Sequence, residues 1–221
     1  MPHLRNQFLY FIFAMKMKTY NGMDGIEKSS FRDFLKKIYG DSSDAELSAE
    51  AREMLKAKTR IIRLNKGEYL QIEGDVCKYW GYVVDGLVRV YYLRQDEEVT
   101  EQLASNGEGF LDYDSYFNQS PSRHFIQMLE PTTLYLFPQL ECEDLCDNNL
   151  EIKLFFRKLT ENVLLREKKR IKETIFKSAK ERYEILLSEK PNLVLRVPSI
   201  YIASYLGITP ETLSRIKTKM K

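Results

Sequence analysis

The sequence predicts an α+β protein in which an N-terminal antiparallel β-roll is followed by a long helix and by a pair of short C-terminal helices. Three observations predict this fold. Short runs rich in Val, Ile, Tyr and Leu, separated by glycines, occupy residues 59–137. Helical spacing of apolar residues then continues over residues 150–177, and two shorter helical patterns meet at Gly207. No helical pattern separates the strand-like runs from one another, which argues against a parallel α/β sheet.

The composition is that of a folded protein, with 43% hydrophobic and 30% charged residues. The charge is unevenly distributed along the chain. Residues 151–221 contain 17 Lys and Arg against 8 Asp and Glu, a net charge of +9, whereas residues 1–150 contain 17 against 24, a net charge of −7. A basic module on an acidic body predicts a nucleic acid or an acidic surface as partner, although a solvated basic helix would give the same count.

The N-terminus contains a short apolar run, residues 8–14, which is too short to span a bilayer. Methionines at positions 15, 17 and 23 favour an upstream extension of the reading frame, placed at residues 1–25, with a signal peptide as the alternative. The three cysteines form no CxxC pair and the chain has only two histidines. This pattern predicts free thiols in a reducing cytoplasm and no metal site.

The first structural segment, residues 26–147, is predicted to be the β-roll domain. Its turns are expected at Gly67, Gly74, Gly86 and Gly107. Residues 29–57 have the spacing of two short amphipathic helices that would cap the roll. Their apolar positions are Phe31, Phe34, Leu35, Ile38, Leu47, Ala51, Met54 and Leu55.

The long helix is predicted in the segment of residues 148–177. Its row of apolar residues is longer than one small domain needs in order to cover its own core. A helix of this length often pairs with a copy of itself. We therefore predict a parallel homodimer in which the contact is formed by Ile152, Phe155, Leu159 and Val163. Packing of the helix on its own body alone is the alternative.

The last segment, residues 178–221, is predicted to begin with a helix over residues 179–188. The stretch "LVLRVP" after it is expected to be an extended connection. Ser199 is the expected N-cap of the next helix, residues 200–206.

The turn after that helix contains Gly207, whose missing Cβ removes the steric penalty on turning. Thr209 is then the expected N-cap of a second helix, with Pro210 in its first position, where the absent N–H costs nothing. Two short helices joined in this way have the spacing of a helix-turn-helix.

The outward residues of the second helix are polar or basic. Arg215 can donate two hydrogen bonds to guanine O6 and N7, and Glu211 can accept one from a cytosine amino group. Ser199, Thr212 and the terminal lysines are suited to phosphates. The predicted DNA-binding residues are Ser199, Glu211, Thr212, Ser214, Arg215, Lys217 and Lys219. A helical hairpin used only for packing would have little reason to collect basic residues at this exposed end.

Over residues 29–221 the chain resembles the Crp–Fnr superfamily of bacterial transcription regulators. "IASYLGITPETLSRIKTKM" is similar to that family's DNA-reading signature, in which Glu211 and Arg215 match the base-contacting pair. "KGEYLQIEGD" and "YVVDGLVRVYY" are similar to the first strands of its cyclic-nucleotide-binding-like jelly roll. Pro210 departs from the pattern, because many members carry a basic residue there. The resemblance implies a winged-helix type helix-turn-helix domain, a homodimer, double-stranded DNA as ligand and RNA polymerase as a further partner.

The resemblance also bears on the effector. Family members that bind cyclic AMP present a Gly-Glu pair to the ribose and an arginine to the phosphate, whereas this chain has Leu111-Asp112 and Ser122-Arg123 in the matching segment. We therefore predict a degenerate sensor domain in which a cyclic nucleotide is not the expected effector. An unknown small molecule, or none, would take its place, with Asp112, Tyr113 and Arg123 as the candidate contacts. Three cysteines are too few for an iron–sulfur cluster, and haem would depend on His124 alone.

The sequence thus predicts a cytoplasmic, homodimeric, sequence-specific transcription regulator without a cofactor. The rival hypothesis is a ligand-sensing module whose C-terminal helices bind a protein partner rather than DNA. An enzyme is not expected, because no nucleophile–base pair, phosphate loop or metal cluster has a convincing spacing.

Overall fold

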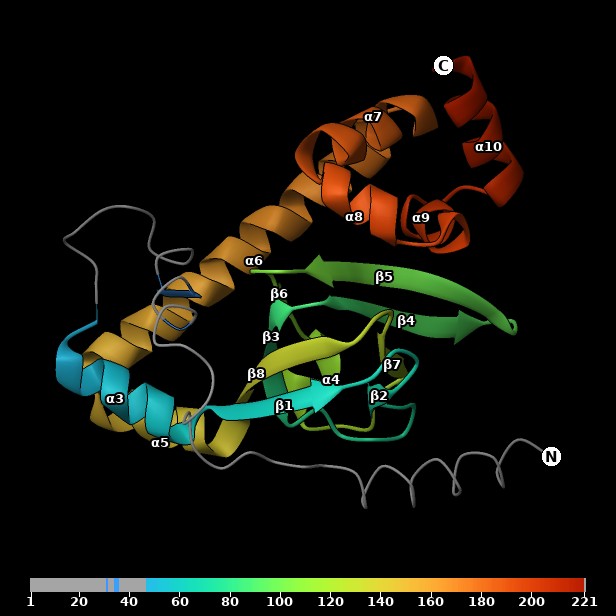
Figure 1. The fold of residues 1–221 in the computed structure, drawn as a ribbon. Coiled ribbons are helices and arrows are strands. Elements are labelled where there is room, and N and C mark those ends of the chain that lie inside the picture. The colour runs from blue at the N-terminus through green and yellow to red at the C-terminus, as the bar shows by residue number, and fades with distance from the viewer. Residues whose placement is uncertain (1–30, 32–33, 36–46, 221) are drawn as a thin grey trace.

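The computed structural model describes residues 31, 34–35 and 47–220 (Figure 1). The expected extension, residues 1–25, lies outside the described residues, as does Ile38. Phe31, Phe34 and Leu35 are helical and buried, in agreement with a helix in that segment. Over the part of the chain that the structure describes, none of the helices combines the length and the apolar character that crossing a membrane requires.

The described strands form a jelly roll of two four-stranded antiparallel sheets. The first sheet has the order β1-β8-β3-β6 and the second the order β2-β7-β4-β5. The strands are β1 (Arg60–Leu64), β2 (Tyr69–Gln71), β3 (Tyr79–Asp85), β4 (Leu87–Arg94), β5 (Glu97–Ser105), β6 (Gly109–Phe110), β7 (His124–Met128) and β8 (Thr132–Pro138). The antiparallel roll that the sequence predicts is therefore confirmed.

The first sheet is buried on both faces, because its side chains alternate between two cores. Ile62 and Val83 face the second sheet and pack in the interior of the roll, whereas Ile61 and Tyr82 face outward into an aromatic cluster. Within that cluster the ring of Phe34 lies 5.7 Å from the ring of Phe155 in an edge-on arrangement.

Helices cover this outer aromatic face. They are α3 (Ala49–Lys58), α5 (Gln139–Asn148) and the long α6 (Leu150–Phe176), while the short α4 (Tyr113–Asn118) follows β6 (Figure 1). The sequence predicts α3 and α6, but α4 and α5 were not expected. The helix α4 has only six residues, and in α5 the acidic residues of "LECEDLCDNN" obscure the spacing of the buried Cys142 and Leu145.

The C-terminal domain is helical throughout. It comprises α7 (Ala179–Glu189), α8 (Pro191–Arg196), α9 (Ser199–Tyr205) and α10 (Pro210–Lys219). One expectation was wrong here. The stretch "LVLRVP" lies mostly in α8 rather than in an extended connection, because Pro191 stands at a first helical position and starts the helix. No strand follows β8 among the described residues.

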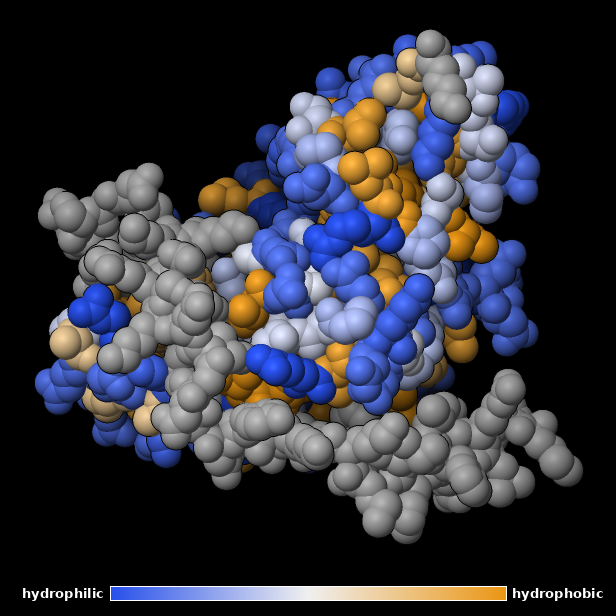
Figure 2. Space-filling view, in the orientation of Figure 1, coloured by the Kyte–Doolittle hydropathy of each residue, from blue (hydrophilic) through white to orange (hydrophobic). Residues whose placement is uncertain are grey.

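This helical domain packs on the second sheet of the roll. Leu87 and Leu103 of the roll share one apolar cluster with Ile202, Leu206 and Leu213 of the helices. In Figure 1 these helices lie beside β4 and β5, and α6 joins them to the far side of the roll. Figure 2 shows hydrophobic residues at the surface of this end of the molecule, where Leu195 and Ile200 are exposed.

Candidate nucleic-acid interface

Helices α9 and α10 meet in the turn that the sequence predicts. Gly207 has a φ of +66°, a left-handed conformation that disfavours residues with a Cβ. The hydroxyl of Thr209 accepts a hydrogen bond from the backbone N–H of Thr212 at 3.2 Å, which caps α10. Pro210 follows in the first turn of the helix. The start of the second helix is therefore confirmed.

The inner side of α10 is anchored and its outer side is free. Leu213 and Ile216 are buried against Ile202 and Ala203 of α9. The expected DNA contacts lie on the other side, where Glu211, Ser214, Arg215 and Lys219 are exposed and Thr212 and Lys217 are half-buried. Arg215 donates a hydrogen bond from Nη2 to the hydroxyl of Thr212 at 3.1 Å. The structure therefore gathers the predicted residues on one surface.

Ser199 does not cap α9, contrary to the expectation from sequence. It is the first residue of the helix, Pro198 occupies the cap position, and no side chain caps this end. The hydroxyl of Ser199 instead accepts a hydrogen bond from Nζ of Lys217 at 2.7 Å. The two side chains come from the two helices of the motif, so they place one cation where α9 and α10 meet.

The predicted dimer residues are not available to a second copy of the chain. Ile152, Phe155 and Leu159 are buried in the aromatic cluster of the chain's own roll, and Val163 is half-buried beside them. That row of apolar residues is therefore used internally, and the prediction of these contacts was wrong. The opposite face of α6 carries the exposed residues Leu150, Leu154, Leu164, Leu165, Ile171, Ile175 and Phe176.

The candidate effector residues do not come together. Arg123 is exposed, whereas Asp112 is 1% exposed. The hydroxyl of Tyr113 accepts a hydrogen bond from Nη2 of Arg166 at 3.0 Å. The neighbouring Ser122, and not Arg123, is the buried residue at this point of the chain, just before β7. The expected pairing of Asp112 with Arg123 around one ligand was wrong.

Asp112 is instead the centre of an internal polar network. Its carboxylate accepts hydrogen bonds from Nε2 of Gln71 at 2.9 Å and from the hydroxyl of Ser122, and it caps α4 by accepting from the backbone N–H of Ser115. Nδ1 of His124 lies 3.3 Å from the same carboxylate. Burial by itself would raise the pKa of Asp112, but the hydrogen bonds from His124 and Ser122 outweigh it and lower the pKa to about 2.

His124 bridges two carboxylates. Its Nε2 lies 2.6 Å from Oε2 of Glu101 on β5, and its other nitrogen faces Asp112. Burial by itself would lower the pKa of His124, but the hydrogen bonds with Asp112 and Glu101 raise it to about 10. The sequence pattern did not reveal this network, because its members come from separate strands and connections that only the fold brings together.

Arg89 on β4 is a second feature that the sequence did not reveal. Its side chain is 1% exposed and donates from Nε to Thr100 at 2.9 Å and from Nη1 to Glu98 at 2.5 Å. The guanidinium lies between two rings, 4.2 Å from that of Tyr91 and 3.7 Å from that of Tyr201. Since Tyr201 belongs to α9, Arg89 joins the roll to the helix-turn-helix.

Comparisons with known proteins agree with this architecture. Residues 61–149 match the family model described as the cyclic nucleotide-binding domain. No curated protein matches the chain.

Solved structures with the same fold include FixK2 from Bradyrhizobium japonicum, with a TM-score of 0.63, 21% identity and coverage of 73% of this chain and 84% of that one. A CooA mutant from Carboxydothermus hydrogenoformans has a TM-score of 0.59 and 22% identity, with coverage of 84% and 83%. CLP from Xanthomonas campestris, described as a c-di-GMP responsive global regulator, has a TM-score of 0.61 and 17% identity, with coverage of 78% and 91%. Residues 61–149 therefore match the cyclic nucleotide-binding domain, and the chain as a whole has the fold of these solved structures, in agreement with the resemblance of its sequence to the Crp–Fnr superfamily.

Proposed function

We propose that this protein is a homodimeric, sequence-specific DNA-binding transcription regulator. One observation carries the proposal: α10 presents Glu211 and Arg215, one helical turn apart, on a free surface, while Leu213 and Ile216 fix its other side to α9. A helix held in this way fits the major groove of DNA, with its N-terminal residues toward the base edges.

The proposed DNA contacts are of two kinds. Arg215 and Glu211 are assigned to base edges, because a guanidinium and a carboxylate match guanine and cytosine in the major groove. Lys217 and Ser199, which lie 2.7 Å apart where α10 meets α9, are assigned to a phosphate. Thr212, Ser214 and Lys219 complete the same surface.

The dimer contact is assigned to the outer face of α6. One row of side chains along this face has the alternating spacing of four and three residues that defines a heptad pattern. Its apolar members are Leu150, Leu154, Leu164, Ile171 and Ile175, and its charged members are Arg157, Glu161 and Lys168. These apolar side chains are 41–70% exposed in the single chain, so a second α6 would remove them from water. Two recognition helices in such a dimer bind half-sites about one DNA turn apart.

The sensor domain is proposed to act without a cyclic nucleotide. Such a ligand needs a cation for its phosphate and a free acceptor for its ribose. Arg123 is exposed, and Asp112 is occupied by Gln71, Ser122 and His124. The buried network therefore takes the place of the ligand contacts.

Arg215→Ala tests the proposal. We expect the affinity for a selected genomic site to fall by about 1–3 kcal/mol, with relaxed preference at one base pair, because a bidentate base contact is lost. The measurement is fluorescence anisotropy with DNA fragments enriched from a genomic library. Lys78→Ala is the matched control, because Lys78 is an exposed cation on the roll.

The same titrations distinguish the rival function. Binding through several cations should weaken steeply with salt on a log–log plot, and cyclic AMP should leave it unchanged. An equal loss on every DNA sequence would make Arg215 a phosphate contact. No enrichment of any genomic fragment would contradict the proposal and favour a protein partner for the C-terminal helices.

A further inference from the structure

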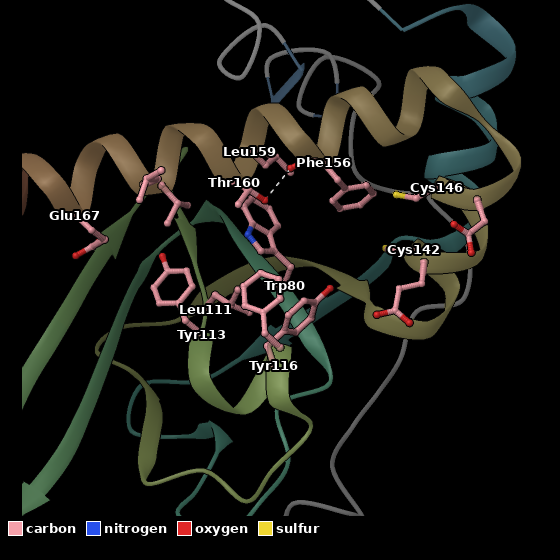
Figure 3. A pocket seen from close by; sticks show the side chains of 15 residues that line it. Trp80, Leu111, Tyr113, Tyr116, Cys142, Cys146, Phe156, Leu159, Thr160 and Glu167 are labelled. Carbon is pink, nitrogen blue, oxygen red and sulfur yellow. Dashed lines mark hydrogen bonds between the residues drawn. The ribbon is translucent and has the colours of Figure 1, made fainter.

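A cavity of about 560 Å³ lies between α4, α5 and α6, on the helical side of the roll (Figure 3). Its volume is in the range of pockets that hold small organic molecules. Five aromatic side chains line it: Trp80, Tyr113, Tyr116, Phe117 and Phe156. Phe117 is 61% exposed, so one ring of this wall meets solvent.

This cavity is separate from the polar network of the roll. Gln71, Asp112, Ser122 and His124 are not among its lining residues. The wall is formed instead by side chains of the helices, with Trp80 from β3 and Leu111 from the chain between β6 and α4. The cavity therefore has its own chemistry, which the ribose and phosphate contacts of a cyclic nucleotide do not describe.

The charge of the wall has one sign. Three carboxylates line the cavity, Glu143, Asp147 and Glu167, and none of its lining residues is a lysine, arginine or histidine. Glu167 is paired with Arg166 at 3.2 Å. Glu143 and Asp147 stand four residues apart on α5, and no ion pair is formed by either within the described chain. Like charges at this spacing repel each other, a cost that a bound cation would remove.

The two thiols of the wall do not add charge. Cys142 and Cys146 are free and lie one turn apart on α5, on the same side as Glu143 and Asp147. Burial raises the pKa of Cys142 to about 12, so this thiol stays neutral in the physiological range. A neutral sulfur is a polarizable surface that suits the apolar part of a ligand.

We propose that this cavity binds an organic cation with an aromatic or branched apolar body. The cationic group lies toward Glu143 and Asp147 on α5, and the body packs among the rings of Trp80, Tyr116 and Phe156. Aromatic faces attract cations and the carboxylates add to this attraction, whereas an anion finds no cation in the wall. Such a ligand contacts one side of α6, which leads to the C-terminal domain. An effect of the ligand on DNA binding would pass along this helix; that part of the proposal rests on the proposed function.

Trp80 makes the binding directly measurable, because it is the only tryptophan of the chain. The full chain is titrated with benzyltrimethylammonium, and with benzoate as an anion of similar size. We expect saturable quenching of the Trp80 fluorescence by the cation. The affinity for benzoate should be lower than that for the cation by a factor of roughly ten or more. The readout needs no DNA, so failure here is distinct from failure of the proposed function.

Two variants locate the cation. The double variant Glu143→Gln, Asp147→Asn should weaken binding of benzyltrimethylammonium by roughly tenfold. Asp144→Asn is the matched control, because Asp144 is an exposed carboxylate on the same helix that does not line the cavity. The control should bind as the unmodified chain does.

Absence of saturable quenching, equal affinity for benzoate, or equal losses in the double variant and the control would each exclude this cation site. A second copy of the chain would occupy the cavity instead if two results came together. The unmodified chain would bind neither probe, and Thr160→Phe, which adds bulk on the α6 side of the cavity, would change the dimer dissociation constant.

Discussion

His124 is the residue that links two carboxylates of the roll. It lies between Asp112 and Glu101, with 15% of its side chain exposed. Both neighbours raise its pKa, and it in turn lowers that of Asp112. An ion pair between His124 and Asp112 thus occupies the position at which a cyclic nucleotide would be expected, and its strength depends on pH.

We predict that His124→Gln lowers the free energy of unfolding by about 1–3 kcal/mol near neutral pH, because Asp112 loses a charged donor. The folded pKa of His124, about 10, exceeds its ordinary value of 6.5, so its contribution is full below pH 6.5 and is lost as pH rises through 10. The contribution of Asp112 is full above its ordinary pKa of 3.8 and is lost as pH falls toward 2.

Urea unfolding across this pH range measures the effect. The difference in stability between the unmodified chain and His124→Gln should narrow as pH rises toward 10. Gln127→Asn, a substitution on the same strand outside the network, should leave the pH profile unchanged. A difference that widens with rising pH would contradict the assignment of the charge pair.

At the scale of the element, α6 has two apolar faces with different uses. One face, with Ile152, Phe155 and Leu159, completes the core of the roll. The other exposes leucine and isoleucine side chains over the length of the helix, as in Leu154 and Ile171. A helix that is apolar on two sides needs two partners to cover it. The single chain supplies one.

We predict that Ile171→Glu dissociates the dimer, because it places a like charge on each copy within the proposed contact. Ile171 is 59% exposed, so the single chain should keep its fold. We expect the dissociation constant to rise roughly a hundredfold or more, measured by sedimentation velocity over a range of concentrations. Leu140→Glu is the control, because Leu140 is 75% exposed and lies on α5. Equal dissociation constants for the two variants would place the dimer contact elsewhere.

At the scale of the molecule, the helix-turn-helix is held against the roll by polar as well as apolar contacts. The hydroxyl of Ser204 accepts from the N–H of Thr100 at 2.8 Å and donates to the carbonyl of Glu98 at 2.9 Å. Arg196 donates to the carbonyl of Gly86 at 2.8 Å. With Arg89 buried between the two domains, the orientation of α10 depends on the outer surface of the roll.

We predict that Ser204→Ala loosens this docking, because it leaves the N–H of Thr100 without its partner, at a cost of about 1 kcal/mol. Hydrogen exchange should become faster in the peptide that contains β5 and stay unchanged in β8. Ser214→Ala, on the free surface of α10, is the control and should leave exchange in β5 as it is. Unchanged exchange in both variants would mean that the two domains do not dock in solution.

The elements that the sequence predicted correctly are those with strong local signals. Thr209, Pro210 and Gly207 fix the turn and the start of α10 by cap chemistry and backbone freedom, which act within a few residues. The antiparallel roll follows from short strands and glycine turns in the same way. Elements were missed or misassigned where the local signal was weak, as in the six-residue α4 and in α8.

The sequence by itself thus determined the succession of β-roll, long helix and terminal helix pair, and the residues that α10 exposes. Only the tertiary structure decided which apolar face of α6 is covered, that Asp112 is paired with His124 rather than with Arg123, and that Arg89 contacts Tyr201. The physical reason is that periodicity and caps are local properties. Each of the other outcomes depends on contacts between residues far apart in the chain, through sheet register and through the packing of one domain on another.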